Sequence, residues 1–315
     1  MCLCAANISS KEAIMKKIEK QQLLEAVSNI KIWKQGDKRA PHKPLLLLLT
    51  LSRLQHGKER LVLFSDIEKP LTELLIEFGP WRKSNHPEQP FFRLPSDGIW
   101  ELLDNQGGIP IINRKFTKTS LRKEKIKGGF TQIVFDLINA DSELLEQLSN
   151  ILLEANFPNT IHQDILDAVG LDIESNHQGK ISQEKRRKRD PAFRGKILQA
   201  YNYRCAICGF DVRLGNTPIA LEAAHIMWHQ AGGPDIENNG LALCSLHHKL
   251  LDRGALAIST EFRIIISEKA NGYIGFKEWL LDFDGKKLNM PQKEAYAPSI
   301  GFTEWHVREV FQGYY

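Results

Sequence analysis

Two pairs of metal-ligating residues with the same spacing place the tightest constraint on how this chain folds. Cys205 and Cys208 are separated by two residues, and Cys244 and His247 repeat that spacing after thirty-five intervening residues. A gap of two residues lets a tight turn present both side chains to one tetrahedral ion, and four such ligands close a structural zinc site. One pair alone also fits a redox motif or chance, whereas two pairs favour zinc. We therefore predict one Zn²⁺ ion bound by these four residues.

Length and composition indicate a soluble protein with about two domains. The 315 residues are 42% apolar and 25% charged, which is typical of globular chains. The longest apolar run, Leu45–Leu51, is far shorter than the roughly 20 residues of a membrane-spanning helix. The N-terminus has no basic segment before an apolar stretch, so no secretory signal is visible. We expect a cytoplasmic protein without a membrane partner.

Positive charge is concentrated in two short runs. Residues 114–127 carry a net charge of +6 and residues 180–189 carry +5, in a chain whose net charge is only +4. The rest of the chain is therefore acidic overall. Cationic runs in an otherwise acidic protein are typical of polyanion binders such as DNA-binding proteins. For either run alone, a solvated surface segment is an equally good interpretation.

The pattern of apolar residues predicts an α+β protein with a mainly helical first domain. Helical spacing predicts helices within 12–34, Leu45–Leu54, Ile67–Phe78, 129–157 and a weaker 161–169, and Pro and Asp-Gly signals bound two predicted strands, Phe91–Leu94 and Gly98–Leu102. We predict a DNA-reading domain over 1–155, a polar and basic linker over 156–189, and a second domain over 190–315. The second domain should open with a helix over Pro191–Tyr203, with Asp190 as its N-cap.

The residues around the second pair of metal ligands resemble the HNH endonuclease family. His225 ends the predicted strand LEAAHI, Asn239 belongs to NNGLALC, and His248 belongs to LHHKLLDRG. These segments occur in the family's order around the zinc pairs, and the resemblance covers residues 189–258. It implies a ββα-metal fold and a nuclease that hydrolyses DNA phosphodiester bonds.

The resemblance also implies a role for each of the three residues. His225 would be the general base, since an imidazole with a pKa near 6.5 takes a proton from water at neutral pH. His248 would hold a catalytic Mg²⁺ or Mn²⁺ ion, and Asn239 would shape the loop and orient His225 through a side-chain hydrogen bond. The sequence departs from the family at Ala224, where many members have an acidic metal ligand, and at His247, where a fourth cysteine is usual. Glu222, His229 and Asp252 are alternative substitutes for the missing acid.

The first domain resembles the sulfur-binding domain of modification-dependent (Type IV) restriction endonucleases. The segments that carry this resemblance are 38–44, 81–94 and 97–100, and the resemblance covers most of residues 15–150. Such domains recognise DNA in which sulfur replaces a non-bridging phosphate oxygen. Sulfur is more polarisable and less tightly hydrated than oxygen, so a selective pocket needs an apolar lining with cations on the other phosphate oxygens. The DNA- and sulfur-binding candidates are Arg39, Arg82, Lys83, His86, Pro87, Gln89, Pro90, Phe91 and Arg114.

Together these features predict an endonuclease that binds phosphorothioated double-stranded DNA and cuts it nearby. Three other interpretations stay open at this point: an HNH enzyme that reads 5-methylcytosine or plain sequence, a zinc-dependent DNA-binding protein without nuclease activity, and an RNA-directed partner. The sequence leaves open the target motif, the cut position and the oligomeric state, for which a homodimer is one option.

Overall fold

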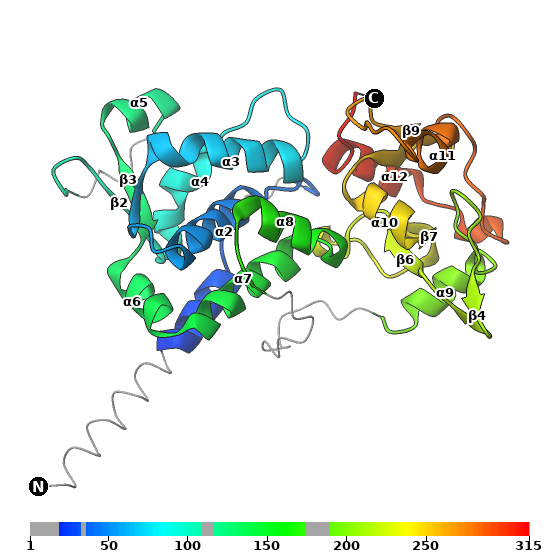
Figure 1. Cartoon of the computed structure of the whole chain (residues 1–315), viewed down its shortest axis with the longest axis horizontal. Coiled ribbons are helices and arrows are strands. Elements are labelled where there is room, and N and C mark those ends of the chain that lie inside the picture. The colour runs from blue at the N-terminus through cyan, green and yellow to red at the C-terminus, as the bar shows by residue number, and fades with distance from the viewer. Residues whose placement is uncertain (1–18, 33–35, 109–115, 174–189, 315) are drawn as a thin grey trace, which may run out of the picture.

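The computed structural model describes residues 19–32, 36–108, 116–173 and 190–314. These residues form an N-terminal lobe (19–173) and a C-terminal lobe (190–314), which lie side by side in Figure 1. Both lobes combine helices with small antiparallel sheets, which confirms the α+β prediction. Within the described ranges, no helix has the length and apolar character needed to cross a bilayer.

The N-terminal lobe is built around helix α2 (His42–Gln55), which has almost no polar face. Leu45, Leu46, Leu47 and Leu48 are all at most 1% exposed. A helix that is apolar all round must be covered on all sides, and α2 is packed against α3 (Phe64–Phe78), α4 (Glu88–Arg93), α7 (Ser142–Asn156) and α8 (His162–Val169). Pro44 lies in the first turn of α2, as predicted, where its missing N–H costs no hydrogen bond.

A three-stranded antiparallel sheet covers one end of this lobe. Its strands are β1 (Leu61–Leu63), β3 (Lys127–Phe130) and β2 (Trp100–Leu103), in that order. The central strand carries Gly129, where a Cβ atom would lie 2.1 Å from the carbonyl oxygen of Arg60. The lobe is completed by a helical segment over 19–28 and by α5 (Lys118–Lys123), α6 (Gln132–Ala140) and the 3-10 turns η1 (Leu94–Asp97) and η2 (Asn159–Ile161).

Two predictions for this lobe are wrong in detail. The predicted strand Phe91–Leu94 is helical, because Pro87 and Pro90 fall at the N-cap and in the first turn of α4, where fixed φ angles suit a helix. Helical spacing then places both Phe91 and Leu94 in the core, each 0% exposed. The predicted helix over 129–157 is two helices, because Asp141 caps α7 through hydrogen bonds from the N–H groups of Glu143 and Leu144.

The N-terminal lobe also extends beyond residue 155. Ile161, Ile165, Leu166 and Val169 are buried in the same hydrophobic core as the leucines of α2. The weak helix predicted over 161–169 is α8, and it belongs to this core rather than to a linker. The basic run at 180–189 lies outside the described residues, as does Arg114.

The C-terminal lobe contains the predicted ββα unit. Strands β6 (Leu221–His225) and β7 (Gly240–Cys244) pair antiparallel, and α10 (Ser245–Asp252) follows β7 directly. Helix α9 (Phe193–Ala200) packs on both strands. It begins later than predicted, because Asp190 caps a preceding turn by accepting from the Ala192 N–H at 2.8 Å. The other elements are β4 (Arg213–Leu214), β5 (Thr217–Pro218), β8 (Leu256–Ile258), β9 (Ile264–Ile266), α11 (Phe276–Trp279), α12 (Ile300–Glu309) and the 3-10 turns η4 (His229–Ala231), η5 (Glu237–Asn239), η6 (Leu281–Phe283) and η7 (Glu294–Tyr296).

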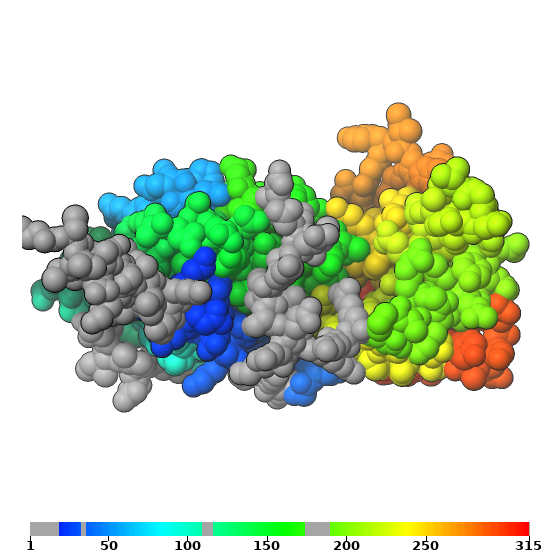
Figure 2. Space-filling model, turned by 90° about the horizontal axis from the view of Figure 1, so that it is seen from below, coloured from blue at the N-terminus to red at the C-terminus, as the bar shows by residue number. Residues whose placement is uncertain are grey.

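The two lobes share a packed interface, and the lobes are in contact in Figure 2 as well. Trp228, Trp305 and Val310 of the C-terminal lobe join the hydrophobic core of the N-terminal lobe. Around them, the indole N–H of Trp305 donates to the Asp37 carbonyl at 2.9 Å, and Arg253, the C-cap residue of α10, pairs with Glu77 of α3 at 2.8 Å. The interface therefore combines apolar burial with ion pairs.

Candidate active site

The four predicted metal ligands converge on one point. The Sγ atoms of Cys205, Cys208 and Cys244 and one ring nitrogen of His247 all lie within 4.8 Å of one another. Hydrogen bonds with Cys208 and Cys244 lower the pKa of the Cys205 thiol, while hydrogen bonds with Cys205 and Cys208 raise the pKa of the Cys244 thiol. Opposite shifts on adjacent thiols mean that the sulfurs cannot all ionise at this spacing without a cation. The cluster therefore fits a metal ion such as zinc.

His247 is oriented toward this cluster by a second contact. Its Nδ1 atom lies 3.1 Å from Cys244 Sγ, and its Nε2 atom lies 3.0 Å from the carbonyl oxygen of Trp279. A ring that donates from Nε2 to a carbonyl keeps its Nδ1 lone pair for a metal, as metal-binding histidines generally do. The neighbouring His248 points elsewhere, so the two adjacent histidines serve different sites.

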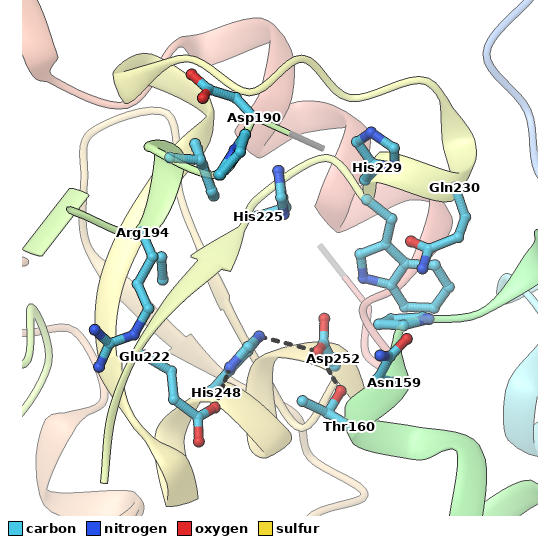
Figure 3. Close-up of a pocket in the computed structure, with 15 residues that line it drawn as sticks. Asn159, Thr160, Asp190, Arg194, Glu222, His225, His229, Gln230, His248 and Asp252 are labelled. Carbon is cyan, nitrogen blue, oxygen red and sulfur yellow. Dashed lines mark hydrogen bonds and ion pairs between the residues drawn. The ribbon is translucent and has the colours of Figure 1, made fainter. Parts of the chain in front are cut away.

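A cleft of about 390 Å³ lies beside the ββα unit. It is lined by His225 and Glu222 of β6, by His248 and Asp252 of α10, and by residues of the N-terminal lobe such as Thr160. Figure 3 shows these side chains around the opening, with His248 between Glu222 and Asp252. The candidate site is therefore assembled at the junction of the two lobes.

His248 is held by a carboxylate at each ring nitrogen. Its Nδ1 atom lies 2.6 Å from Glu222 Oε2, and its Nε2 atom lies 3.3 Å from Asp252 Oδ2. Burial disfavours the charged ring, but Asp252 and Glu222 outweigh burial and raise the pKa of His248 to about 9. Two of the three substitutes for the acid missing at Ala224 thus contact His248, whereas His229 lies near Asp235. The metal-free ring is therefore protonated at neutral pH and donates to both carboxylates, and a divalent cation bound by one ring nitrogen and a carboxylate oxygen would displace a proton from the ring.

His225, the predicted general base, ends β6 and also faces the cleft. Its ring stacks on Phe193 of α9, with 4.2 Å between ring centroids. Its Nε2 atom lies 2.7 Å from Asp235 Oδ1. His225 thus lines the same cleft as His248, and it has a carboxylate partner that the sequence did not reveal.

Asn239 acts on the loop between the strands rather than on the His225 side chain. It is 0% exposed, its Oδ1 atom accepts from the Met227 N–H at 2.8 Å, and its Nδ2 atom donates to the carbonyls of Met227 and Pro234. The expected loop-shaping contacts are present. The expected hydrogen bond to the His225 ring is replaced by these backbone bonds, because the carboxamide is fully used by the loop.

The predicted DNA-reading residues separate into exposed and buried groups. Arg82, Lys83 and His86 are exposed and Gln89 is partly exposed, whereas Pro87, Pro90 and Phe91 are buried. Phe91 in particular packs edge-on against Phe64 and Trp100 in the core. The apolar residues of this segment are therefore buried, and its charged residues form the solvent-exposed surface of the loop.

Arg39 is used by the interface between the lobes. Its guanidinium donates to the Glu309 carbonyl at 2.7 Å and to the Phe78 carbonyl at 3.0 Å, and it lies 3.8 Å from the Trp228 ring centroid. Burial lowers the pKa of Arg39 to about 9 despite the Glu309 carboxylate. Arg82 also reaches Glu309, at 3.1 Å. In this arrangement the Arg39 guanidinium is engaged inside the protein and does not face a DNA phosphate.

Sequence reasoning missed two residues of the site. Asp235 lies ten positions after His225, and Thr160, whose hydroxyl donates to Asp252, lies in the other lobe. The Pro234-Asp235 step between the two strands was the available signal for Asp235. Thr160 left no signal, because its partner is distant in the sequence.

Comparisons with known proteins assign both lobes. Residues 20–174 match the family model of the ScoMcrA-like DNA sulfur-binding domain, and residues 205–259 match the model of the HNH endonuclease domain. Comparison with the curated proteins gave no match.

Among solved structures, the chain is similar to the sulfur-binding domain of SprMcrA complexed with phosphorothioated DNA, with 21% identity over 48% of this chain and 94% of that one and a TM-score of 0.41. The corresponding domain of ScoMcrA complexed with phosphorothioated DNA gives 18% identity over 47% of this chain and 94% of that one, with a TM-score of 0.40. The modification-dependent TagI restriction endonuclease gives 21% identity over 38% of this chain and 37% of that one, with a TM-score of 0.28.

The chain therefore joins a DNA sulfur-binding domain to an HNH endonuclease domain, and this combination defines the class of modification-dependent endonucleases. Within that class, the N-terminal lobe matches the ScoMcrA-like sulfur-binding domain and the ββα lobe matches the HNH endonuclease domain.

Proposed function

We propose that this protein binds phosphorothioated double-stranded DNA through its N-terminal lobe and hydrolyses nearby phosphodiester bonds in the cleft of its C-terminal lobe. The observation that carries this proposal is the pairing of a sulfur-binding domain with a cleft lined by both His225 and His248. A base and a cation-binding group on one cleft are what metal-assisted hydrolysis of a phosphodiester requires.

In the proposed reaction, His225 is the general base. A water molecule attacks the phosphorus atom and gives its proton to the His225 ring, and the bond between phosphorus and the 3′ oxygen breaks. The products are a 5′ phosphate and a 3′ hydroxyl, the latter formed when the leaving oxygen takes up a proton. Phe193 stacks on His225 and limits rotation of its ring, which keeps the ring at the edge of the cleft.

His248 would hold a divalent cation, Mg²⁺ or Mn²⁺, together with an oxygen of Asp252 or Glu222. When bound, such an ion neutralises the negative charge that develops on the attacked phosphate. The two carboxylates contact different nitrogens of His248, so one of them shares the cation side and the other holds the ring in place. This assignment supplies the acid that is absent at Ala224, which is 0% exposed on β6. For the cluster of Cys205, Cys208, Cys244 and His247 we propose structural Zn²⁺.

For the N-terminal lobe we propose a reading surface on the loop before α4. Arg82, Lys83 and His86 are exposed there, and the His86 Nδ1 atom lies 2.9 Å from Glu88 Oε1. These groups suit the charged oxygens of the backbone. Contacts of this kind position a protein on DNA, while the sulfur atom distinguishes the modified phosphate.

Cleavage assays on matched duplexes test the proposed function. One duplex carries a phosphorothioate, a second carries 5-methylcytosine and a third is unmodified, each with Mg²⁺, Mn²⁺ or EDTA. We expect cleavage of the phosphorothioated duplex only, and only with a divalent cation. Preferential cleavage of methylated or plain DNA would mean that the N-terminal lobe recognises a feature other than the phosphorothioate. Tight binding without cleavage under every condition would instead favour a zinc-dependent DNA-binding protein.

A further inference from the structure

The carboxylate of Asp235 contacts the proposed general base, His225. Asp235 Oδ1 lies 2.7 Å from His225 Nε2, and the two side chains are only 12% and 13% exposed. The pair is therefore largely shielded from solvent, where an ion pair is stronger than at a surface. Asp235 belongs to the loop that connects η4 with η5.

The position of the Asp235 carboxylate is set by the backbone around it. Its Oδ2 atom accepts from the N–H of Asp190 at 2.7 Å. The loop that carries it is closed by Asn239, which donates to the Pro234 carbonyl at 2.9 Å. The loop is also too tight at Gly233 for any side chain, since a Cβ atom there would lie 1.8 Å from the Met227 carbonyl oxygen. The Asp190 N–H thus holds the Asp235 carboxylate, and the Asn239 side chain holds the loop that carries it, so that the carboxylate faces His225.

We propose that Asp235 is the positioning residue for His225, which rests on the proposed function. A carboxylate at Nε2 holds the proton of the neutral ring on that nitrogen, so the basic lone pair is on Nδ1. The same carboxylate stabilises the imidazolium that forms when His225 takes the proton of the attacking water. An aspartate serves a histidine base in this way in the Ser-His-Asp triads of hydrolases, with the two ring nitrogens exchanged.

The other polar groups around the pair do not replace Asp235 in this role. His229 Nε2 lies 3.9 Å from Asp235 Oδ2, with its ring 5.8 Å from that of His225. The Asp190 carboxylate pairs with Lys196 at 2.9 Å. Burial opposes the charge on Asp235, but the Asp190 N–H and His225 outweigh it and lower the pKa of Asp235. Asp235 is therefore ionised at neutral pH.

The test compares cleavage by four full-length proteins: wild type, Asp235→Asn, His225→Ala and the double variant. Glu237→Gln, the same change from carboxylate to carboxamide two residues later, at the start of η5, is the matched control. Single-turnover cleavage of the phosphorothioated duplex is measured from pH 5 to 9. Zinc content and DNA affinity report whether each variant is folded.

We expect Asp235→Asn to slow cleavage between about 10-fold and about 10⁴-fold, the range for groups that orient a catalytic or metal-binding histidine. The pH below which the cleavage rate falls should be lower in this variant than in wild type, because loss of the carboxylate lowers the pKa of the imidazole. In the His225→Ala background, Asp235→Asn should cause no further loss, since Asp235 acts through His225. Glu237→Gln should cleave as wild type does.

A wild-type rate for Asp235→Asn, or an equal loss in the His225→Ala background, would overturn the assignment. If Asp235 had a structural role alone, its replacement would lower the cleavage rate without changing the pH at which that rate falls. Nitrogen-15 NMR of the histidine rings gives a readout independent of cleavage and of the variant's folding: the wild-type His225 ring should carry its proton on Nε2. An Nδ1-protonated ring would overturn the inference even if the protein cuts DNA. Absence of cleavage by wild type with an Nε2-protonated His225 would contradict only the proposed function.

Discussion

The two histidines of the cleft are held by different electrostatic environments. His248 lies between Asp252 and Glu222, and although burial opposes its charge, these carboxylates raise its pKa to about 9. His225 pairs with the Asp235 carboxylate and stacks on the Phe193 ring. Two carboxylates beside one imidazole supply oxygen ligands for a cation, and a carboxylate that orients an imidazole suits that ring to proton transfer. The roles proposed for the two residues follow from this difference.

Replacing His225 with alanine should abolish cleavage without preventing DNA binding. The general base acts on water, so its loss should lower the cleavage rate by about 10² to 10⁴ while affinity for phosphorothioated DNA stays near that of wild type. Single-turnover cleavage and equilibrium titration with the same duplex measure the two quantities. His56→Ala, on the far end of α2, is the control and should cleave normally. Near wild-type cleavage by His225→Ala would remove His225 from the mechanism.

His306 should make the protein less stable in acid. Its side chain is 1% exposed, its Nε2 atom lies 3.0 Å from the Leu251 carbonyl, and burial lowers its pKa to about 4. The unfolded chain takes up a proton near pH 6.5, but the folded chain does not until about pH 4. Stability is therefore full above about pH 6.5 and falls as pH drops toward 4.

The variant His306→Gln keeps a donor for Leu251 but does not titrate. Its urea midpoint should depend less on pH between 7 and 4.5 than that of wild type. His42, whose pKa burial also lowers to about 4, accounts for part of the remaining slope. An unchanged slope in His306→Gln would show that His306 is not a source of the acid sensitivity.

At the scale of elements, the metal cluster connects the start of α10 to the turn that follows α9. Cys244 and His247 lie at the N-terminal end of α10, and Cys205 and Cys208 lie in that turn. A metal ion here joins segments about forty residues apart, so its binding free energy contributes to folding of the whole ββα unit. His248 and Asp252 are on the same helix and depend on that placement.

Cys208→Ser should therefore remove both the metal and the activity. We expect about one zinc ion per chain in wild type, little or none in the variant, a lower midpoint of thermal unfolding and no cleavage. Atomic absorption and calorimetry measure the first three. Serine variants of Cys2 and Cys4 should retain zinc. A zinc-free wild type with an intact fold would refute the structural role.

At the scale of the whole molecule, Glu309 of α12 connects the two lobes. Its side chain is 0% exposed and accepts from the backbone N–H of Arg39 at 3.0 Å and from the Arg82 guanidinium at 3.1 Å. The Arg308 Nε atom donates to its other oxygen at 2.9 Å. The buried carboxylate thus accepts from one backbone N–H of the N-terminal lobe and from two partly exposed guanidinium groups, one from each lobe.

Replacing Glu309 with alanine should destabilise the protein strongly. Removing one partner of a buried ion pair leaves an uncompensated charge and typically costs about 3–5 kcal/mol. The Glu309 carboxylate accepts from the Arg39 N–H, and its charge offsets the burial of the Arg39 guanidinium, whose own hydrogen bonds go to the main-chain carbonyls of Glu309 and Phe78. We therefore expect a loss at the lower end of this range, which chemical unfolding followed by tryptophan fluorescence would detect. The double variant Arg39→Met with Glu309→Leu should recover much of the stability, since no charge remains unpaired. Equal stability of Glu309→Ala and wild type would mean that the lobes separate readily in solution.

The sequence by itself determined the features that depend on local spacing. The two ligand pairs predicted the metal cluster, the apolar leucine run predicted α2, and the order of His225, Asn239 and His248 predicted the ββα unit. Each is a short-range pattern, because the spacing of side chains along a turn, helix or strand is set by the backbone. The strand predicted at Phe91–Leu94 failed because two prolines and a pair of aromatic residues fit either structure, and core packing decided between them.

Only the tertiary structure decided which distant side chains meet. Asp235 orients toward His225 through a loop closure, Thr160 reaches Asp252 across 92 positions, and Arg39 reaches Glu309 across 270. No local pattern encodes these contacts, since each depends on how whole elements and both lobes pack. The same packing turned Arg39 away from the DNA-binding role that its sequence context suggested, because two main-chain carbonyls and an indole ring engage its guanidinium inside the protein.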